Sequence, residues 1–381
     1  MSTNNEIIIN GRSFSFEDGD TILEVAENNN IYIPTLCHLK GTIPTGACRV
    51  CVVEVEGARN LVASCAAPAS KNMVVKTDSP KVIKARRFVI AFLIASGNHN
   101  CSSRGNTFND WCDFQLEVNQ YDKTDEICDA YGVCKLQELA YRYQVTELIS
   151  DLRLGEMKQT YSIEDVNPYI IRDFSRCILC GRCVKACNEI QVNNAISIGY
   201  RGSSAKIVTS SDAPLVDSDC VFCGDCLQVC PVGALVLKDI HNDIRPWDLD
   251  LVESTCTYCG TGCSIDIYTK DNKIVKISGS ENGIVNKGSL CIKGRFGFDF
   301  VHSKDRLTKP LVKSGDDFKE VEWDEALNLI SSKLSEFKDK NGSDSIAGLS
   351  SARCTNEDNY IMQKFFRATI GTNNIDHCAR L

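Results

Sequence analysis

Two stretches with the same cysteine spacing decide the fold: "CILCGRCVKAC" from Cys177 to Cys187 and "CVFCGDCLQVC" from Cys220 to Cys230. Each has the pattern C-x2-C-x2-C-x3-C, so the chain contains an internal repeat. Gly181 and Gly224 occupy the same place in the two copies, where a residue without a Cβ lets the backbone bend closely. Four thiols that converge from such a tight turn are a metal-binding arrangement.

This spacing is typical of two 4Fe-4S clusters, in which the fourth cysteine of each run binds the cluster of the other run. Structural zinc, the alternative, uses a different ligand spacing. The pattern therefore predicts a domain over residues 165–240 that transfers electrons and does no chemistry on a substrate. The expected ligand sets are Cys177, Cys180, Cys183 and Cys230 for one cluster, and Cys187, Cys220, Cys223 and Cys226 for the other.

Length and composition indicate a modular protein. A chain of 381 residues exceeds what one hydrophobic core organises, and a net charge of -8 argues against a nucleic-acid partner. The start of the chain shows no charged and apolar leader, and the longest apolar run, Phe88–Ala95, is too short to cross a membrane and indicates a buried helix. We therefore expect a cytoplasmic protein without a transmembrane segment. The reducing cytosol keeps its 22 cysteines free for metal.

The first part of the chain is rich in expected strands. Glu6–Phe16 predicts a hairpin with a turn at Asn10-Gly11, and Asp20 is the expected N-cap of the helix that follows. Further strands are expected in "CVVEVEG" and "MVVKT". The surrounding loops carry the pattern C-x10-C-x2-C-x13-C, formed by Cys37, Cys48, Cys51 and Cys65.

This unit resembles the 2Fe-2S ferredoxin-like domain at the front of the large iron-sulfur subunit of respiratory complex I and of multi-cluster hydrogenases and formate dehydrogenases. The resemblance covers residues 1–78 and implies a β-grasp domain whose 2Fe-2S cluster is bound by Cys37, Cys48, Cys51 and Cys65. A zinc knuckle is the alternative, although structural zinc usually takes two short cysteine pairs.

Residues 79–150 are expected to form a second cluster domain. Ser79-Pro80 begins a helix that runs to about Ser96, and His99 follows it. In the families just named, this helix leads to a 4Fe-4S site with one His and three Cys ligands. The resemblance assigns His99, Cys101, Cys128 and Cys134, with an insertion before Cys128 and Cys112 as a spare cysteine. A lone histidine at a helix end more often interacts with the helix dipole, but three nearby cysteines favour the ligand.

A fifth cysteine pattern, C-x2-C-x3-C-x27-C, follows a predicted linker over Lys238–Thr255. It resembles the 4Fe-4S domain that opens the molybdenum or tungsten bis-pterin oxidoreductases, the family of formate dehydrogenase and nitrate reductase. The resemblance covers residues 252–308 and assigns a 4Fe-4S cluster to Cys256, Cys259, Cys263 and Cys291. It also assigns Lys293 as an electron relay to the pterin, whereas a solvated surface lysine is the alternative.

The last segment, residues 309–381, continues as that family does. An amphipathic helix over Val321–Gly342, a buried strand over Asp344–Ser350 and a helix over Thr355–Gly371 predict the opening of a molybdopterin-binding α/β domain. Cys112, Cys354 and Cys378 are left over and are interpreted as ordinary buried or loop thiols. The whole chain is therefore expected to have an α+β multidomain fold.

These resemblances imply the electron-transfer portion of a formate dehydrogenase catalytic subunit. Such an enzyme converts formate to carbon dioxide at a Mo- or W-bis(pterin guanine dinucleotide) centre, present only in the full-length protein. The expected partners are flavin- and NAD(P)-binding iron-sulfur subunits, ferredoxin or a hydrogenase module, since no Gly-rich dinucleotide fingerprint occurs in this chain.

Three alternatives to this function remain. The large subunit of complex I lacks the cysteine repeat, and iron-only hydrogenases continue differently from "CTYCGTGC" at Cys256–Cys263. The third alternative, a stand-alone electron-transfer module, needs no active site at all.

The final residues generate a first prediction. The stretch "NNIDHCARL" ends at Leu381. In the formate dehydrogenases that this chain resembles, the metal-ligating Cys or selenocysteine comes at the next position. No catalytic residue is therefore expected within residues 1–381. Because a selenol ionises more readily than a thiol, it suits a metal ligand. We expect codon 382 to be UGA, followed by a His codon and the rest of a pterin domain. Sequencing the gene checks this, and a UAA or UAG codon would contradict it.

Overall fold

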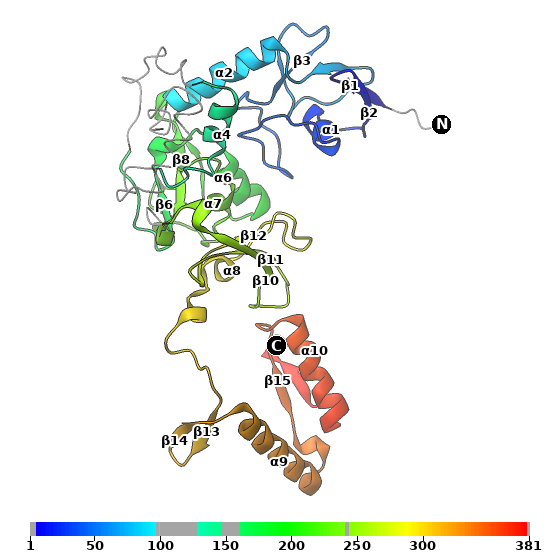
Figure 1. Cartoon of the computed structure of the whole chain (residues 1–381), viewed down its shortest axis with the longest axis vertical. Helices are drawn as coiled ribbons and strands as arrows, with labels where there is room; N and C mark the ends of the chain where they lie inside the picture. Colours follow the sequence, from blue (N-terminus) through cyan, green and yellow to red (C-terminus); the bar gives the residue numbers. More distant parts are fainter. Residues whose placement is uncertain (1–4, 97–98, 100–127, 146–160, 241–243, 379–381) are drawn as a thin grey trace. The chain divides into compact units, whose positions relative to one another are not determined.

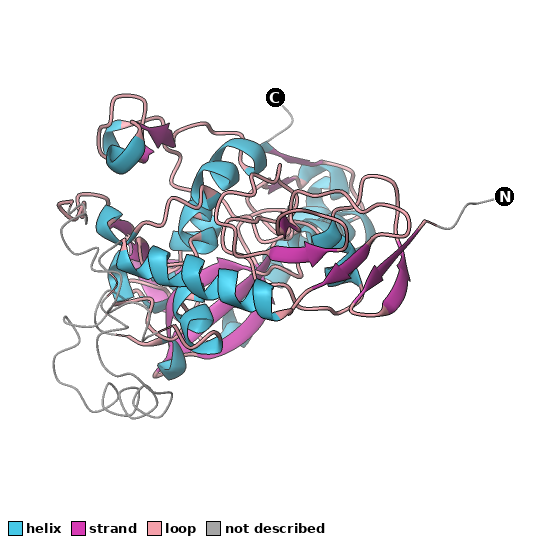
Figure 2. Ribbon diagram, turned by 90° about the horizontal axis from the view of Figure 1, so that it is seen from above, coloured by secondary structure: helices cyan, strands magenta, loops and turns pink. Residues whose placement is uncertain are grey.

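The computed structural model describes residues 5–96, 99, 128–145, 161–240 and 244–378. They form two compact units, Met1–Leu249 and Asp250–Leu381, which are described separately. Most strands are short, each unit contains a long helix, and loops join most elements (Figure 2).

The first unit begins with a five-stranded sheet in the order β2-β1-β5-β3-β4 (Figure 1). β1 pairs antiparallel with β2 through the expected turn, and it pairs parallel with β5. Apolar residues of the helix α1 pack against the buried side chains of β1, β3 and β5. The elements are β1 Glu6–Ile9, β2 Arg12–Ser15, α1 Ile22–Asn28, β3 Val52–Val55, β4 Val62–Ala63 and β5 Val74–Lys76.

The N-cap of α1 is Thr21, and the prediction of Asp20 was wrong by one residue. The Thr21 hydroxyl accepts a hydrogen bond from the Glu24 N–H at 3.2 Å, and the Glu24 carboxylate accepts one from the Thr21 N–H at 2.8 Å. Asp20 instead accepts from the Glu17 N–H at 2.9 Å. The reciprocal pair satisfies two backbone donors, which a cap at Asp20 alone would not do.

The helices α2, Pro80–Ala95, and α4, Lys135–Arg142, pack together over an apolar cluster (Figure 1). The predicted start of α2 is confirmed, since Ser79 caps it and Pro80 is its first residue. The prediction that the run Phe88–Ala95 is buried holds on one face only. Phe88 is 42% and Phe92 45% exposed, because the helical period turns them away from Ile90 and Ile94.

Arg86 ties these elements to the sheet. Its side chain is fully buried, and its guanidinium donates to the Asp78 carboxylate at 3.0 Å, to the Tyr143 hydroxyl at 2.9 Å and to the Val52 carbonyl at 2.9 Å. One side chain of α2 thus holds the end of β5, the end of α4 and β3.

The domain of the cysteine repeat contains two small antiparallel sheets, β6-β9 and β7-β8, and a short helix lies within each run of cysteines. The strands are β6 Ile170–Arg172, β7 Ser197–Gly199, β8 Lys206–Val208 and β9 Leu235–Leu237. The helices are α6 Arg182–Lys185, its π-helical continuation Ala186–Ile190, and α7 Asp225–Val229. Short 3-10 turns lie at Phe174–Arg176, Gly202–Ser204, Leu215–Asp217, Lys238–Ile240 and Pro246–Asp248.

The second unit opens with an antiparallel sheet in the order β10-β11-β12, against which α8 packs. The predicted linker over Lys238–Thr255 was wrong at its end, because residues from Asp250 onward pair with β11. The elements are β10 Asp250–Thr255, β11 Ser264–Lys270, β12 Lys273–Gly279, α8 Ile292–Phe296 and a 3-10 turn at Asp299–His302.

A hairpin and a small α/β unit complete the described chain. The two predicted helices are present, and β15 pairs parallel with β16. The strand predicted to be buried is only partly so, since Gly348 is buried but Leu349 is 83% exposed. The elements are β13 Leu311–Ser314, β14 Asp317–Glu320, α9 Trp323–Asn341, a 3-10 turn at Ser343–Ser345, β15 Gly348–Ser350, α10 Asn356–Lys364, its π-helical continuation Phe365–Ile370, and β16 Ile375–His377.

Within the described ranges, no helix combines the length and the apolar character that a membrane span requires.

The contacts of Arg86 generate a stability prediction. Replacing Arg86 by Met keeps the apolar stem but leaves the buried Val52 carbonyl without its donor, so we expect a loss of about 3 kcal/mol of unfolding free energy. Arg59→Met, at an exposed position of the same compact unit, is the matched control and should change little. Thermal unfolding of the full-length protein measures both, and equal midpoints for the two variants would contradict the role given to Arg86.

Candidate iron-sulfur centres

Cys37, Cys48, Cys51 and Cys65 lie together as two close pairs. The Cys37 sulfur accepts a hydrogen bond from the Cys48 N–H at 3.4 Å, and the sulfurs of Cys51 and Cys65 lie 3.3 Å apart. Cys37, Cys51 and Cys65 are each only 1% exposed. The loop before β3 and the turn after β4 bring these residues together, and the pairing of β3 with β4 fixes their separation.

Hydrogen bonds between the four cysteine side chains shift their pKa values. Side-chain hydrogen bonds with Cys48 and Cys65 lower the pKa of the Cys37 thiol, and the bond between Cys51 and Cys65 lowers the pKa of Cys51 to about 6. Side-chain hydrogen bonds with Cys37 raise the pKa values of Cys48 and Cys65. Metal binding requires deprotonated sulfur, so a cluster here would replace these thiol protons. The donor set fits a thiolate-bound iron-sulfur cluster.

The two cysteine runs of the repeat have the same backbone. Gly181 and Gly224 are left-handed, with φ of 73° and 76°, and a helix begins directly after each. Leu179 and Phe222 are also left-handed, with φ of 51° and 53°, which is unusual for bulky residues. This conformation directs the N–H of each toward the sulfur two residues earlier, Cys177 or Cys220, at 3.4 Å.

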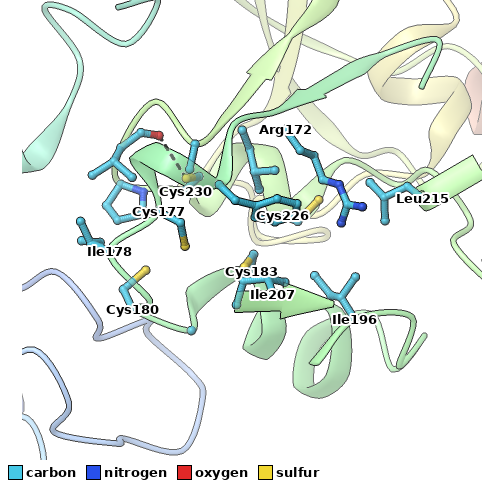
Figure 3. A pocket seen from close by; sticks show the side chains of 16 residues that line it. Arg172, Cys177, Ile178, Cys180, Cys183, Ile196, Ile207, Leu215, Cys226 and Cys230 are labelled. Carbon is cyan, nitrogen blue, oxygen red and sulfur yellow. Dashed lines mark hydrogen bonds between the residues drawn. The ribbon is translucent and has the colours of Figure 1, made fainter. Parts of the chain in front are cut away.

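A cavity of about 40 Å³ lies among five cysteines of the repeat and apolar side chains (Figure 3). The structure brings Cys230, from the end of the second run, to Cys177, Cys180 and Cys183 of the first. The Cys230 sulfur lies 3.0 Å from the Val232 carbonyl, which holds it at the cavity. The cysteines that line the cavity are Cys177, Cys180, Cys183, Cys226 and Cys230.

Burial dominates the chemistry of these sulfurs. It raises the pKa of Cys177 to about 11 and that of Cys180 to about 12, and it raises the pKa of Cys183 well above its usual value. The charge of Cys230 adds to the rise at all three, which is consistent with its position beside them. Neutral thiols bind iron only after losing protons, so a cluster here must assemble with proton release.

The remaining cysteines of the repeat form a second group. Burial raises the pKa of Cys226. It is raised further by the charges of three other cysteines, Cys223, Cys220 and Cys187. Cys187 also acts on Cys220, whose pKa burial raises. The structure therefore places Cys187, from the end of the first run, within electrostatic reach of Cys220 and Cys226 of the second run.

Of the expected His99 site, Cys101 and the spare Cys112 lie outside the described residues. Cys128 and Cys134 are described, and burial raises the pKa of Cys128. The Arg245 guanidinium donates to the Cys128 carbonyl at 2.9 Å, and a Cβ on Gly233 would lie 2.6 Å from the Cys128 sulfur. Sequence reasoning missed Arg245 and Gly233, because both are distant from Cys128 in the chain.

Cys256, Cys259, Cys263 and Cys291 approach one another in the second unit. Burial raises the pKa values of Cys256 and Cys263, and the charges of Cys259 and Cys291 raise them further. A side-chain hydrogen bond with Thr261 lowers the pKa of Cys259, and the charge of Lys293 lowers it further. Lys293 therefore lies near this cysteine group, on the helix α8 that Cys291 caps.

The two remaining described cysteines lie in the α/β unit. Cys354 is half-buried, while Cys378 is exposed and lies 3.8 Å from the Ser351 hydroxyl at the carboxyl end of β15. The backbone of Ala352 lowers the pKa of Cys378. Cys378 is thus a loop thiol with more thiolate character than usual.

Among the described residues, no three His, Cys, Asp or Glu side chains are arranged to hold a single metal ion. An iron-sulfur cluster differs from a single ion, because inorganic sulfide bridges its iron atoms. The cysteine sulfurs that bind a cluster therefore lie farther apart than the ligands of a single metal ion. In the first unit, Cys48, Cys134, Cys177 and Cys230 all pack against one apolar cluster that includes Leu36, Val50 and Val232. Three expected centres therefore border the same apolar core.

Comparison with known families assigns domains to these groups. The family model for the "2Fe-2S iron-sulfur cluster binding domain" matches residues 3–80, and that for the "4Fe-4S dicluster domain" matches 176–234. The "Molybdopterin oxidoreductase Fe4S4 domain" matches residues 249–303, and "Molybdopterin oxidoreductase" matches 306–381. Residues 249–381 belong to the molybdopterin oxidoreductase family. The chain thus matches iron-sulfur domain models along its first part and molybdopterin oxidoreductase models from residue 249 onward.

Curated relatives match almost the whole chain. It is 35% identical to the alpha subunit of an NADPH-Fe(3+) oxidoreductase from Geobacter sulfurreducens over 98% of its length. It is 32% identical over its full length to YjgC of Bacillus subtilis, which is provisionally named an oxidoreductase. A Staphylococcus aureus protein provisionally named a formate dehydrogenase is 30% identical over 98% of the chain. The chain spans only 40% of the first two relatives and 39% of the third.

One solved structure resembles part of this chain. It is a crystal structure of an NAD+-reducing [NiFe]-hydrogenase in the H2-reduced state, with 29% sequence identity and a TM-score of 0.50. The match covers 62% of this chain and 88% of the hydrogenase chain.

The close contact of Gly233 with Cys128 generates a prediction. In Gly233→Ala the new Cβ would also lie 3.2 Å from the Ala130 Cβ, so Cys128 must move. We expect the full-length variant to lose the iron of one four-iron cluster. Gly294→Ala is the control, since its Cβ would lie 3.6 Å from the Cys256 sulfur, an ordinary contact. Iron analysis of both variants checks this, and full iron in Gly233→Ala would show that Cys128 is no ligand.

Proposed function

We propose that the full-length protein is a formate dehydrogenase and that this chain is its electron-transfer portion. The observation that carries the proposal is the order of its parts. A 2Fe-2S domain and a 4Fe-4S dicluster domain precede the start of a molybdopterin oxidoreductase, and each part holds converging cysteines. The S. aureus relative supports formate as the substrate.

The proposed clusters follow from the cysteine groups. One 2Fe-2S cluster would be held by Cys37, Cys48, Cys51 and Cys65, and four 4Fe-4S clusters by the other sets. Such clusters, when bound, supply one-electron transfer between a substrate site and an acceptor. The 4Fe-4S sets are Cys177, Cys180, Cys183 and Cys230; Cys187, Cys220, Cys223 and Cys226; Cys256, Cys259, Cys263 and Cys291; and His99, Cys101, Cys128 and Cys134.

The chain's own residues have defined tasks in this proposal. The apolar cluster around Leu36 and Val232 excludes water between centres, and the left-handed residues Leu179 and Phe222 direct N–H groups at sulfur. Lys293 keeps a positive charge beside Cys259 and is proposed to link that centre to a pterin. The pterin, with molybdenum or tungsten, belongs to the part of the protein beyond this chain.

We infer a cytoplasmic enzyme whose 2Fe-2S end faces a partner subunit. The proposed partner binds flavin and NAD(P), and ferredoxin or a hydrogenase module are alternatives. Support comes from the relatives, one a subunit of an NADPH-linked oxidoreductase and the other from an NAD+-reducing hydrogenase.

A second candidate is an NADPH-linked reductase, because the relative of that name has 35% identity against 30% for the formate dehydrogenase. Viologen dye reduction by the purified full-length protein separates the two. The proposal expects rapid reduction with formate and none with NADPH alone. Reduction by NADPH and none by formate would overturn it in favour of the second candidate.

The position of the 2Fe-2S domain generates a further prediction. In the full-length complex, Cys48→Ser should leave formate-dependent dye reduction nearly intact but reduce NAD(P) reduction at least tenfold, because the variant affects only the exit to the partner. Cys112→Ser, at the spare cysteine, is the control and should leave both rates unchanged. Equal loss of both activities in Cys48→Ser would contradict an exit at this domain.

A further inference from the structure

Lys185 is a buried cation with no assigned task. It is 6% exposed, and within the described ranges its ammonium group has no hydrogen-bond acceptor. A buried charge without a partner is strongly unfavourable, so a lysine in this position needs a compensating negative group.

The helix geometry directs Lys185 away from the clusters of its own domain. Cys183 and Cys187 are four residues apart and lie on one face of the helix, and Lys185, two residues from each, lies on roughly the opposite face. Arg182 shows the contrast, since its charge lowers the pKa of Cys230, inside the dicluster domain.

The face that carries Lys185 meets the 2Fe-2S domain. Glu189, one turn further along, accepts a hydrogen bond at 2.7 Å from the N–H of Ile43, in the loop between Cys37 and Cys48. Burial lowers the pKa of His38, the neighbour of Cys37 in the chain, and the charge of Lys185 lowers it further.

The surroundings of His38 show which charges gather there. Its Nδ1 is buried and has no partner within the described ranges. The carboxylates of Glu24 and Glu27 on α1 raise the pKa of His38, and so does Cys37, whereas Lys185 lowers it. Lys185 contributes a cation from the dicluster domain to this group.

We propose that Lys185 holds a positive charge beside the 2Fe-2S site across the junction of the two domains and thereby raises the reduction potential of that site. This inference rests on the proposed 2Fe-2S ligands. Reduction adds an electron to a site with four thiolates, and a nearby desolvated cation stabilises the extra negative charge. The negative charge of the site would in turn be the compensation that the ammonium group lacks.

Lys40 offers a matched control. It is a lysine in the same loop as His38, but it is exposed, so water and salt screen its charge. Lys185→Met removes the charge and keeps the stem, while Lys185→Arg keeps a cation.

An EPR-monitored redox titration of the two-iron signal in the full-length protein tests the inference. We expect Lys185→Met to lower the ratio of reduced to oxidised sites at least tenfold at a given potential, which is 59 mV for one electron. Lys185→Arg and Lys40→Met should stay near the wild-type midpoint. A shift in Lys185→Met no larger than that in Lys40→Met would overturn the inference.

Two further outcomes are decisive. If the two-iron signal is lost in Lys185→Met but present in Lys185→Arg, the result supports a role for the charge. If the signal is lost in both variants, Lys185 acts through packing and the inference is overturned. Absence of the signal in the wild-type protein would remove the proposed 2Fe-2S site together with this inference. A normal signal and normal formate oxidation with an unmoved midpoint would overturn the inference alone.

Discussion

Burial of sulfur in apolar surroundings is the constraint on which the first unit depends. A buried thiol favours its proton, as the raised pKa values of Cys177 and Cys180 show, so the protein must supply groups that make sulfur a ligand. Backbone N–H groups at Leu179 and Phe222 are directed at sulfur, and Arg182 places a cation beside Cys180 and Cys230. Apolar burial and directed donors therefore occur together around the same atoms.

The two units meet this constraint to different degrees. In the first, Cys37, Cys51 and Cys65 are almost completely buried, and Cys51 and Cys65 belong to the apolar core of the sheet and α1. In the second, Cys291 is exposed and Cys259 has a lowered pKa beside Thr261. The cysteines next to the molybdopterin-binding segment thus lie in a more polar and more open setting than those of the electron-transfer domains.

Local patterns predicted the elements that short-range physics determines. The hairpin at Asn10-Gly11 and the start of α2 at Pro80 follow from turn chemistry and capping. The failures are at Asp20, where a reciprocal cap one residue later competes, and at Asp250, where pairing with a distant strand makes a linker into β10.

Long-range contacts could not be predicted in this way. Arg86, Arg245 and Gly233 act on residues that are far away in the chain, and nothing in their immediate sequence distinguishes them from surface arginines or a loop glycine. Their roles follow only from the packing of one domain against the next.

The shared left-handed conformation of Leu179 and Phe222 bears on how the repeat arose. Each residue accepts about 1 kcal/mol of backbone strain, yet the side chains differ and the dipeptides that contain them, Ile-Leu and Val-Phe, have little in common. What the two copies have kept is the path of the main chain around the cysteines. After a duplication of one ancestral run, this path and the glycines Gly181 and Gly224 would have stayed the same while the other residues between the cysteines changed.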